Sequence, residues 1–145
     1  MVLELVAMEP EEYALMAEVE GKHWWFTSLR KHVLAQLGDR LGDGARVLDA
    51  GCGTGGTLVA LYGRFPSAKI IGIDFSREAI SYAKQKAASQ VAFGNVVDLP
   101  FPDSTFDAVI SLDVICHESV AEKRALGEFF RVVKPGGVVV IDLPA

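Results

Sequence analysis

The sequence predicts an α/β protein in which a doubly wound, mostly parallel sheet carries helices on both of its faces. From residue 46 onwards, five short apolar segments alternate with segments of helical periodicity. Repeated strand–helix–strand units give parallel strands with right-handed crossovers, and these wind into one sheet. A run of residues at 51–56 containing four glycines follows the first strand directly. In such folds the ligand lies at the carboxyl ends of the strands, so the functional residues are expected there.

The composition is that of a single globular domain of 145 residues, of which 50% are hydrophobic and 23% are charged. A net charge of −5 gives no reason to expect nucleic-acid binding. No apolar run approaches the roughly 20 residues that span a bilayer, and the first five residues do not resemble a signal peptide. Two cysteines, Cys52 and Cys116, indicate neither a disulfide framework nor a metal site. We therefore expect a cytoplasmic protein that binds neither membrane nor metal.

Residues 1–44 are expected to form a helical cap or lid. An acidic helix is expected over residues 10–20, because proline is tolerated in a first turn and Gly21 follows. A second helix is expected over residues 23–37, where apolar residues recur at helical spacing at Phe26, Leu29, Val33 and Leu37. Glycines at 38, 42 and 44 then mark a loop.

Residues 45–145 are expected to form the sheet domain. Apolar and β-branched runs predict strands over residues 46–50, 69–74, 90–93, 106–112 and 138–143. Helices are expected from the glycine run to about residue 65, over residues 77–88 and over residues 119–133. Ser76 suits the N-cap of the second of these helices. The sequence Lys-Pro-Gly-Gly at 134–137 predicts a turn before the last strand.

The glycine run fits two kinds of site. Gly51, Gly53 and Gly56 match the G-x-G-x-x-G pattern of dinucleotide-binding proteins. Asp49 favours a different ligand, because a carboxylate would attract a ligand's ammonium group and repel the pyrophosphate of a dinucleotide. Two other interpretations stay open: a tight turn that holds no ligand, and an Asp49 that fixes the loop through hydrogen bonds.

Asp74 ends the second predicted strand and is the second candidate ligand-binding residue. One carboxylate binds two adjacent ribose hydroxyls well, because both hydrogen bonds are charge-assisted. Its position relative to the glycine run is that of the acidic residue which binds ribose in nucleotide folds. The alternative is that Asp74 caps the helix that follows.

Several segments, in order, resemble class I S-adenosylmethionine-dependent methyltransferases. Residues 47–55 (VLDAGCGTG) resemble the first motif of this family. The other matching segments are 72–76 (GIDFS), 94–101 (GNVVDLPF), 106–110 (FDAVI) and 131–137 (RVVKPGG). The resemblance covers residues 46–143 and is strongest to the branch called methyltransferase domain 11 or 12. It implies a Rossmann-like fold that here lacks the family's last two strands.

The resemblance also implies the cofactor, S-adenosylmethionine, with S-adenosylhomocysteine as product, and a role for each matching residue. Asp49 would position the ammonium group, and Gly51, Cys52 and Gly53 would lie against the methionine portion. Asp74 would hold the ribose and Phe75 would pack on the adenine. The adenine edge and the reaction cleft would be lined by Asn95, Val96, Leu112 and Asp113. The family's usual residue at Asn95 is Asp, but Asn still accepts hydrogen bonds through its carbonyl.

Other residues allow two readings each. His117 is the candidate general base, although a lone histidine is more often structural. Trp24 and Trp25 are expected to anchor a helix through buried area, with a cation–π role toward a sulfonium as the alternative. Arg30 is either a ligand for the cofactor's carboxylate or a solvated helix residue. Cys52 and Cys116 are expected to be small packing residues.

The function predicted from the sequence is therefore methyl transfer from S-adenosylmethionine to a small-molecule acceptor. The alternatives are an NAD-dependent oxidoreductase and a non-catalytic S-adenosylmethionine-binding module. The last strand, with no further strand predicted beside it, is expected to expose an edge. The chain is then either a fragment of a longer protein or covers this edge by self-association.

Overall fold

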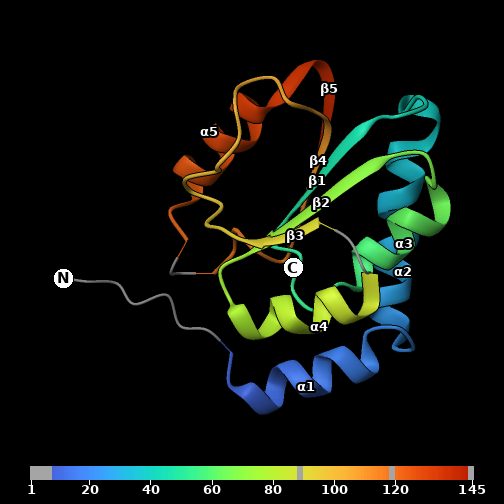
Figure 1. Cartoon of the computed structure of the whole chain (residues 1–145), viewed down its shortest axis with the longest axis vertical. Helices are drawn as coiled ribbons and strands as arrows, with labels where there is room; N and C mark the ends of the chain where they lie inside the picture. Colours follow the sequence, from blue (N-terminus) through green and yellow to red (C-terminus); the bar gives the residue numbers. More distant parts are fainter. Residues whose placement is uncertain (1–7, 88–89, 118–119, 144–145) are drawn as a thin grey trace.

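The structure is a computed structural model that describes residues 8–87, 90–117 and 120–143. Its five strands are all parallel and form one sheet in the order β3-β2-β1-β4-β5 (Figure 1). The strands are β1 (Arg46–Ala50), β2 (Lys69–Asp74), β3 (Gln90–Phe93), β4 (Phe106–Leu112) and β5 (Val133–Asp142). Winding starts at the centre and proceeds first to one edge and then to the other. The predicted doubly wound sheet is confirmed.

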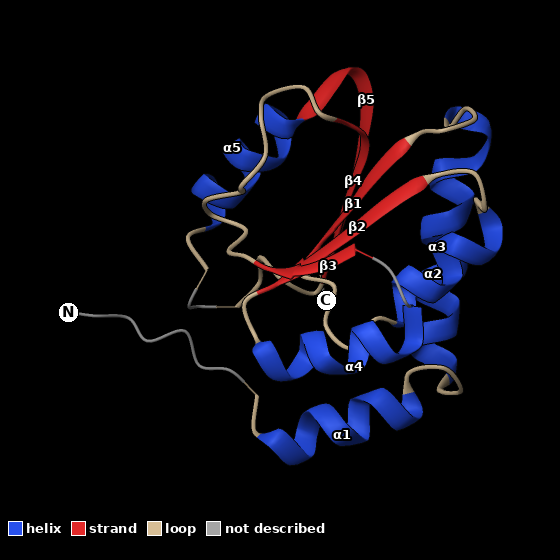
Figure 2. Cartoon of the chain, in the orientation of Figure 1, coloured by secondary structure: helices blue, strands red, loops and turns tan. Residues whose placement is uncertain are grey.

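Helices cover both faces of this sheet (Figure 2). The helices are α1 (Pro10–Val19), α2 (Trp24–Leu37), α3 (Gly56–Arg64), α4 (Arg77–Ala87) and α5 (Glu122–Val132), with a short 3₁₀ turn, η1 (Gly38–Arg40). One core cluster joins α2, α3 and α4 to one face of the sheet, and a second joins α5 to the other. Val47 belongs to the first cluster and its neighbour Leu48 to the second, because side chains alternate across a strand.

The first strand lies at the centre of the sheet and is buried on both faces. Asp49 lies in register with Gly72 of β2 on one side and with Ile110 of β4 on the other. At the opposite end of the sheet, Asp107 Oδ2 accepts a 2.8 Å hydrogen bond from the Arg46 amide. The carboxyl ends of β1, β2 and β4 therefore meet beside the glycine run.

The start of β5 differs from the prediction. The predicted turn at residues 134–137 is part of the strand, because Val133 pairs with Phe106 and Val138 with Ala108. Between these two pairs the chain advances by five residues in β5 and by two residues in β4, so β5 contains a β-bulge with several extra residues. Gly136 within it has φ of 78°, and turns and bulges both require such a glycine. The glycines of the Lys-Pro-Gly-Gly segment are therefore compatible with a turn and with a bulge, and the local sequence does not distinguish the two.

Two helix boundaries also differ from the predictions. Helix α5 begins at Glu122 and ends at Val132, so the predicted span of 119–133 is too long at both ends. Ser119 itself lies outside the described residues, as does the predicted last residue of α4, Ala88. Of the helices described, none has the length and apolar character required to cross a membrane.

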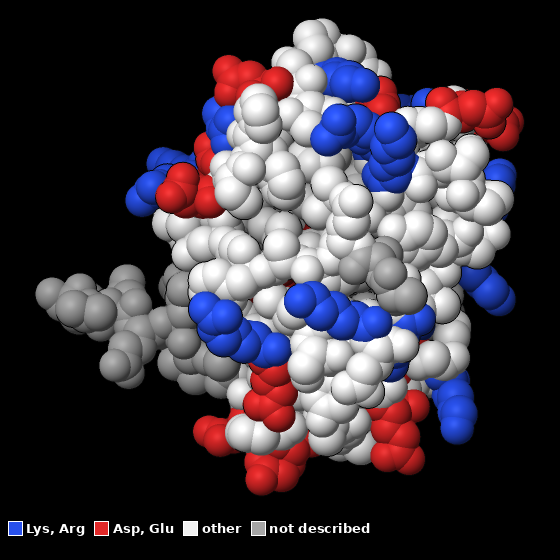
Figure 3. Space-filling view, in the orientation of Figure 1, with Lys and Arg blue, Asp and Glu red and all other residues white. Residues whose placement is uncertain are grey.

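The two N-terminal helices pack on the helical layer beside the glycine run. Helix α1 lies along α4, and α2 contacts α3. Acidic side chains gather over α1 and basic ones over α4 above it (Figure 3). The Lys86 ammonium of α4 donates a 2.6 Å hydrogen bond to the Ala17 carbonyl of α1 and forms an ion pair with Glu20, the C-cap residue of α1. Lys86 therefore helps to hold α1 against the domain.

The expectation that Trp24 and Trp25 anchor a helix by buried area is wrong. Trp24 is 68% exposed and Trp25 is 46% exposed. The inward face of α2 is instead formed by Val33 and Leu37, which are buried. Both tryptophans lie in the first turn of the helix.

Candidate functional site

A cavity lies at the carboxyl ends of β1, β2 and β4. It is lined by all eleven residues to which the sequence analysis gave a place in the donor site, in the reaction cleft or as general base, namely Asp49, Gly51, Cys52, Gly53, Asp74, Phe75, Asn95, Val96, Leu112, Asp113 and His117. They come from four different segments of the chain, which only the sheet brings together. Neither Trp24 nor Trp25 is among the residues that line it. The grouping agrees with the sequence analysis, while the role of each residue remains a prediction.

The glycine loop is fixed to β2 and packs closely against α4. The amides of Gly51 and Cys52 both donate to the Ile73 carbonyl, at 2.8 and 2.9 Å. Gly55 has φ of 95°, and a β-carbon there would lie 2.8 Å from the α-carbon of Ala83. Glycine is therefore required at position 55 for both conformation and space.

Asp49 is a buried carboxylate at the end of the central strand. It is 2% exposed, and its Oδ2 has no hydrogen-bond partner among the residues described. Burial raises the pKa of Asp49 to about 7, and the negative charges of Asp74 and Glu20 add to the rise. A loop-fixing role leaves this oxygen unexplained. A buried acceptor without a partner is costly, so it suits a cationic ligand group.

Asp74 connects the glycine loop to the start of α4. Its Oδ2 accepts a 2.9 Å hydrogen bond from the Gly53 amide, and its Oδ1 accepts one of 2.9 Å from the Ser76 amide. Burial raises the pKa of Asp74, against the effect of these backbone hydrogen bonds. The Ser76 hydroxyl accepts from the Ala79 amide at 3.1 Å, so Ser76 is the N-cap of α4, as predicted. Each Asp74 oxygen retains a lone pair for a ligand hydroxyl.

Asn95 follows β3 at the side of the cavity. Its Oδ1 accepts a 3.1 Å hydrogen bond from the Val97 amide, and a carbonyl oxygen can accept a second one. The turn is closed by the Asp98 amide, which donates to the Asn95 carbonyl at 3.1 Å. Asn95 and Val96 are thus presented to the cavity by a fixed turn.

Glu20 is a site residue that the sequence analysis missed. It is 6% exposed and lines the cavity beside Arg30. The Thr54 hydroxyl donates to Glu20 Oε1 at 2.8 Å, and Arg30 Nη2 lies 3.3 Å from Glu20 Oε2. The Arg30 side chain is 12% exposed, so its reading as a solvated helix residue is wrong. No local sequence pattern identifies Glu20 as a site residue, because its hydrogen-bond partner Thr54 lies 34 residues away in the sequence.

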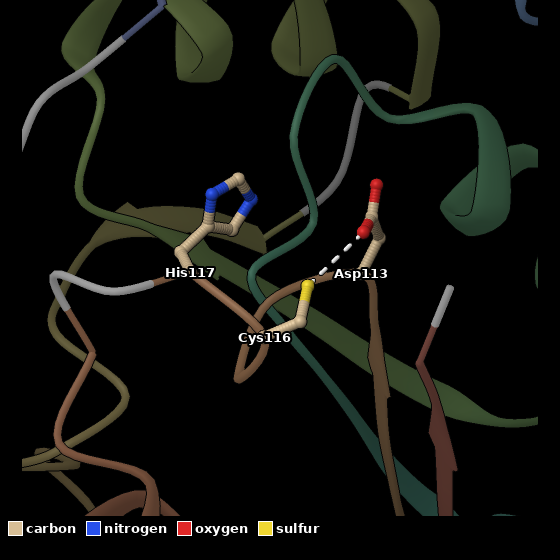
Figure 4. Close-up of side chains that lie close together, drawn as sticks. All are labelled: Asp113, Cys116 and His117. Atoms are coloured by element: carbon tan, nitrogen blue, oxygen red, sulfur yellow. Dashed lines mark hydrogen bonds between the residues drawn. The ribbon is translucent and has the colours of Figure 1, made fainter. Parts of the chain in front are cut away.

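The loop after β4 carries three side chains that meet near the cavity (Figure 4). The Cys116 thiol donates to Asp113 Oδ1 at 3.2 Å. One potential ligand atom from each of Asp113, Cys116 and His117 lies within 4.8 Å of the others. Within the described part of the chain, these exposed residues form the group whose side chains are close enough together to hold a metal ion. Partial desolvation and the Asp113 hydrogen bond raise the pKa of Cys116, which disfavours a thiolate nucleophile.

The two cysteines differ in burial. Cys52 is buried in the core cluster of α2, α3 and α4, as expected of a packing residue, and burial raises its pKa. Cys116 is exposed, so the expectation that it is a packing residue is wrong.

Apolar side chains form another part of the cavity wall. They come from both N-terminal helices and from the loop after β4, and include Tyr13, Met16, Phe26, Leu29 and Val114. The cavity therefore has a polar wall at the strand ends and an apolar wall beneath the N-terminal helices.

Residues 48–141 match the family model described as methyltransferase domain, and the chain belongs to this family. A demethylmenaquinone methyltransferase of Symbiobacterium thermophilum is 35% identical over 144 residues, which cover 94% of this chain and 56% of that protein. The demethylmenaquinone methyltransferase of Thermus thermophilus is 39% identical over 105 residues, which cover 68% and 47%. The chain thus spans about half the length of the curated relatives it matches.

Solved structures of similar fold include an enzyme that is not named as a methyltransferase. A SAM-dependent methyltransferase from Thermotoga maritima is 27% identical with a TM-score of 0.71, covering 90% of this chain and 56% of that one. The [4+2]-cyclase SpnF is 28% identical with a TM-score of 0.71, covering 83% and 47%. The fold is shared between different reactions, so function must be argued from the site.

Proposed function

We propose that this chain carries the S-adenosylmethionine site of a methyltransferase that acts on a small molecule. The observation that carries the proposal is the buried Asp49 oxygen without a partner in the described structure. It lies beside a glycine loop, in a cavity that Asp74 also lines. An ammonium group at Asp49 would supply the missing partner. Membership of the methyltransferase domain family supports the same conclusion.

Each wall of the cavity has a separate task in this proposal. Asp49 binds the donor's ammonium, while the backbone of Gly51–Gly53 lies against the methionine portion. Asp74 accepts both ribose hydroxyls in charge-assisted hydrogen bonds. Phe75 packs on the adenine, and Asn95 and Val96 contact its edge. When bound, the donor supplies a methyl group already activated by its sulfonium.

The chemical task left to the chain is to align the acceptor with that methyl group. The attacking atom has to be held about 3 Å from the methyl carbon, opposite the sulfur. Leu112 and Asp113 line the cavity where β4 ends, and we assign the acceptor to this side. His117 takes the acceptor proton where the acceptor has to lose one. The apolar wall favours an acceptor with apolar surface, and the relatives named demethylmenaquinone methyltransferases agree with such a molecule.

The main alternative is an NAD-dependent oxidoreductase, and the residues around the glycine loop disfavour it. A dinucleotide places its pyrophosphate at the N-terminus of the first helix after the glycine loop. A β-carbon on Gly56, the first residue of that helix, would lie 2.1 Å from Arg30 Nη2 and 2.6 Å from Glu20 Oε2, so an ion pair fills the space beside the helix start. The buried carboxylate of Asp49 would also repel a pyrophosphate at the glycine loop.

Calorimetry with S-adenosylhomocysteine and with NAD tests the proposal. We expect the purified chain to bind the first and not the second, and we expect Asp74→Ala to weaken binding by at least about tenfold through loss of the ribose hydrogen bonds. Asp39→Asn, an exposed carboxylate in η1, is the matched control and should bind as the wild type does. Tight NAD binding without binding of the homocysteine compound would overturn the assignment. A screen for methyl transfer to small acceptors then separates an enzyme from a binding module.

Three further features belong to this proposal. Residues 1–44 act as a lid, because Tyr13, Met16 and Phe26 line the cavity. The protein works in the cytoplasm, where the free thiols of Cys52 and Cys116 stay reduced. Copies of the chain associate through β5, which is an edge strand of the sheet. Light scattering over a range of concentrations should show a mass above that of a monomer, and a constant monomer mass would contradict self-association.

A further inference from the structure

An aspartate, a cysteine and a histidine of the loop after β4 project from the same side of that loop (Figure 4). Cys116 Sγ lies 3.2 Å from Asp113 Oδ1, and a ring nitrogen of His117 lies within 4.8 Å of both ligand atoms. All three residues are exposed, so an ion in solution can reach them. Carboxylate oxygen, thiolate sulfur and imidazole nitrogen are the ligand atoms that Zn²⁺ takes from proteins.

A tight turn brings these three residues together. The Asp113 amide donates to the Asp142 carbonyl of β5 at 3.1 Å, and the His117 amide donates to the Val114 carbonyl at 3.2 Å. Asp113 has φ of 57°, a left-handed conformation that aspartate adopts more readily than most residues. The loop is thus held to the sheet at Asp113 and turns back within four residues, which places positions 113, 116 and 117 side by side.

The separations between the ligand atoms are close to those of tetrahedral coordination. Bond lengths of about 2.3 Å to sulfur and about 2.0–2.1 Å to nitrogen or oxygen place neighbouring ligand atoms roughly 3.3–3.6 Å apart. The Cys116 sulfur and the Asp113 oxygen already lie 3.2 Å apart. The His117 nitrogen has to approach by at most about 1.5 Å, and rotation of its exposed side chain between rotamers provides such a movement.

The charge and the ligand types favour Zn²⁺ over Mg²⁺ and Ca²⁺. A bound cation deprotonates a coordinating thiol, so Asp113 and Cys116 together supply two negative charges and balance the charge of the ion. Sulfur and imidazole suit Zn²⁺, whereas Mg²⁺ and Ca²⁺ take oxygen ligands. The expectation that the chain binds no metal was based on the cysteine count, and a site with one cysteine has no cysteine spacing that would reveal it.

An ion at this place would lie at the edge of the cavity. Asp113 and His117 are among the residues that line the cavity, and Cys116 is not among the lining residues described. Three protein ligands leave the fourth position of a tetrahedral ion open. The ion would also occupy His117, the residue to which we assign the acceptor proton, and it would lie on the side that we assign to the acceptor.

We propose that Asp113, Cys116 and His117 form a zinc site whose occupation blocks the acceptor side of the cavity and leaves the donor side free. The binding of zinc does not depend on the proposed function, whereas its effect on the acceptor rests on that function. Zinc and the acceptor proton compete for the same ring of His117. The zinc-bound chain is therefore inactive, and a chelator that removes the ion restores it.

Cobalt tests the site directly, because Co²⁺ takes the same ligands as Zn²⁺ and absorbs visible light. Titration of the whole, reduced chain should give one ion per chain, with the visible bands of a tetrahedral site and a thiolate-to-cobalt charge-transfer band. Cys116→Ser should abolish the charge-transfer band, and it should weaken binding at least about tenfold, as should Asp113→Asn. Cys52→Ser, which alters the buried thiol, is the matched control and should keep both. A lack of saturable binding, or a charge-transfer band that survives Cys116→Ser, would overturn the inference.

Alkylation gives a second readout on the unaltered chain. Iodoacetamide reacts with the exposed thiol of Cys116, and mass spectrometry follows the rate. Zn²⁺ should slow this reaction at least about tenfold, because the metal occupies the sulfur that attacks the reagent. Mg²⁺ should leave the rate unchanged. Equal rates with and without Zn²⁺ would contradict coordination by Cys116.

Calorimetry and methyl transfer separate the two sides of the cavity. With Zn²⁺ bound, the affinity for S-adenosylhomocysteine should change by less than about threefold, whereas methyl transfer should fall at least tenfold, on the order of 1.4 kcal/mol, and recover with EDTA. Cys116→Ser should keep the basal transfer and lose the sensitivity to zinc. A tenfold loss of donor affinity with zinc would overturn the placement on the acceptor side. Zinc binding by a chain that does not bind S-adenosylhomocysteine would leave the metal site standing and refute its role in methyl transfer.

Discussion

Gly51 and Val114 are in such close contact that a β-carbon on Gly51 would lie 2.3 Å from Cγ2 of Val114. The glycine loop after β1 thus packs against the loop after β4, and both loops line the cavity. A substitution in one loop is therefore transmitted to the other. The following predictions start from this contact and extend to the other groups around the cavity.

Gly51→Ala should destabilise the protein and weaken donor binding. Gly51 has φ of 86°, where alanine costs about 1–2 kcal/mol, and the clash with Val114 adds to this cost. The melting temperature should fall by roughly 2–4 °C for each kcal/mol lost. Adding Val114→Ala should relieve the clash and leave the backbone cost. Gly63→Ala is the control, because Gly63 lies in α3 with no atom near an added β-carbon and alanine favours a helix there by up to about 1 kcal/mol.

The stability of the ligand-free protein should fall between about pH 4 and pH 7 because of Asp49. Its pKa is raised to about 7 by burial and by nearby negative charges, against about 3.9 in an unfolded chain. In this window the folded state binds more protons than the unfolded state, so raising the pH costs up to about 1.4 kcal/mol per unit. Above about pH 7 the group is ionised in both states. Asp49→Asn should lack this decline in melting experiments, and parallel profiles for the two proteins would contradict the assignment.

Donor binding should release a proton below pH 7. An ammonium group favours the ionised form of Asp49, so a protonated Asp49 must lose its proton when the donor binds. Calorimetry at pH 6 in buffers of different ionisation heat measures this release. Asp49→Asn should show a smaller release, and an unchanged release would mean that another group titrates.

Asn95→Asp should strengthen the binding of adenine-containing donors. A carboxylate accepts a stronger hydrogen bond from the adenine amino group than an amide carbonyl does, so the affinity for S-adenosylhomocysteine should rise by up to about tenfold. S-inosylhomocysteine, which lacks that amino group, is the matched ligand and should gain nothing. An equal gain for both ligands would place Asn95 away from the adenine edge.

Ser76→Ala should lower stability by about 1 kcal/mol, because the Ser76 hydroxyl caps α4 through the Ala79 amide. The corresponding fall in melting temperature is roughly 2–4 °C. Ser81→Ala is the control, since the Ser81 hydroxyl donates to the Glu78 carbonyl on the exposed side of the same helix and is not a cap. A similar loss in both variants would argue against a capping role.

The first four strands could be predicted to the residue from the sequence, and the fifth could not. Runs such as residues 69–74 are β-branched and bounded by helix signals, so local pattern alone defines them. The start of β5 depends instead on pairing between Val133 and Phe106, which no local pattern encodes. The burial of Trp24 and Trp25 was predicted wrongly, because large aromatic side chains are usually buried, whereas these two are 68% and 46% exposed.

The site residues that lie in sequence motifs could be predicted, whereas those that reach the cavity through long-range charge pairs could not. Asp49, Asp74 and Asn95 each follow a strand in a recognisable string, and the parallel sheet brings strand ends together. In the sequence, Glu20 is only the last residue of the predicted acidic helix over residues 10–20. Its partners lie 10, 34 and 66 residues further along the chain, so only the tertiary fold identifies it as part of the cavity.

The central place of β1 in the sheet has a consequence for how the protein is made. The Arg46 amide at its start donates a hydrogen bond to Asp107, which lies 61 residues later in the sequence. At about 5–20 residues per second, a ribosome needs roughly 3–12 s to synthesise that stretch. During this interval the nascent chain presents one open side of its central strand. Chaperones that cover exposed strands during translation therefore have a defined window in which to act on this protein.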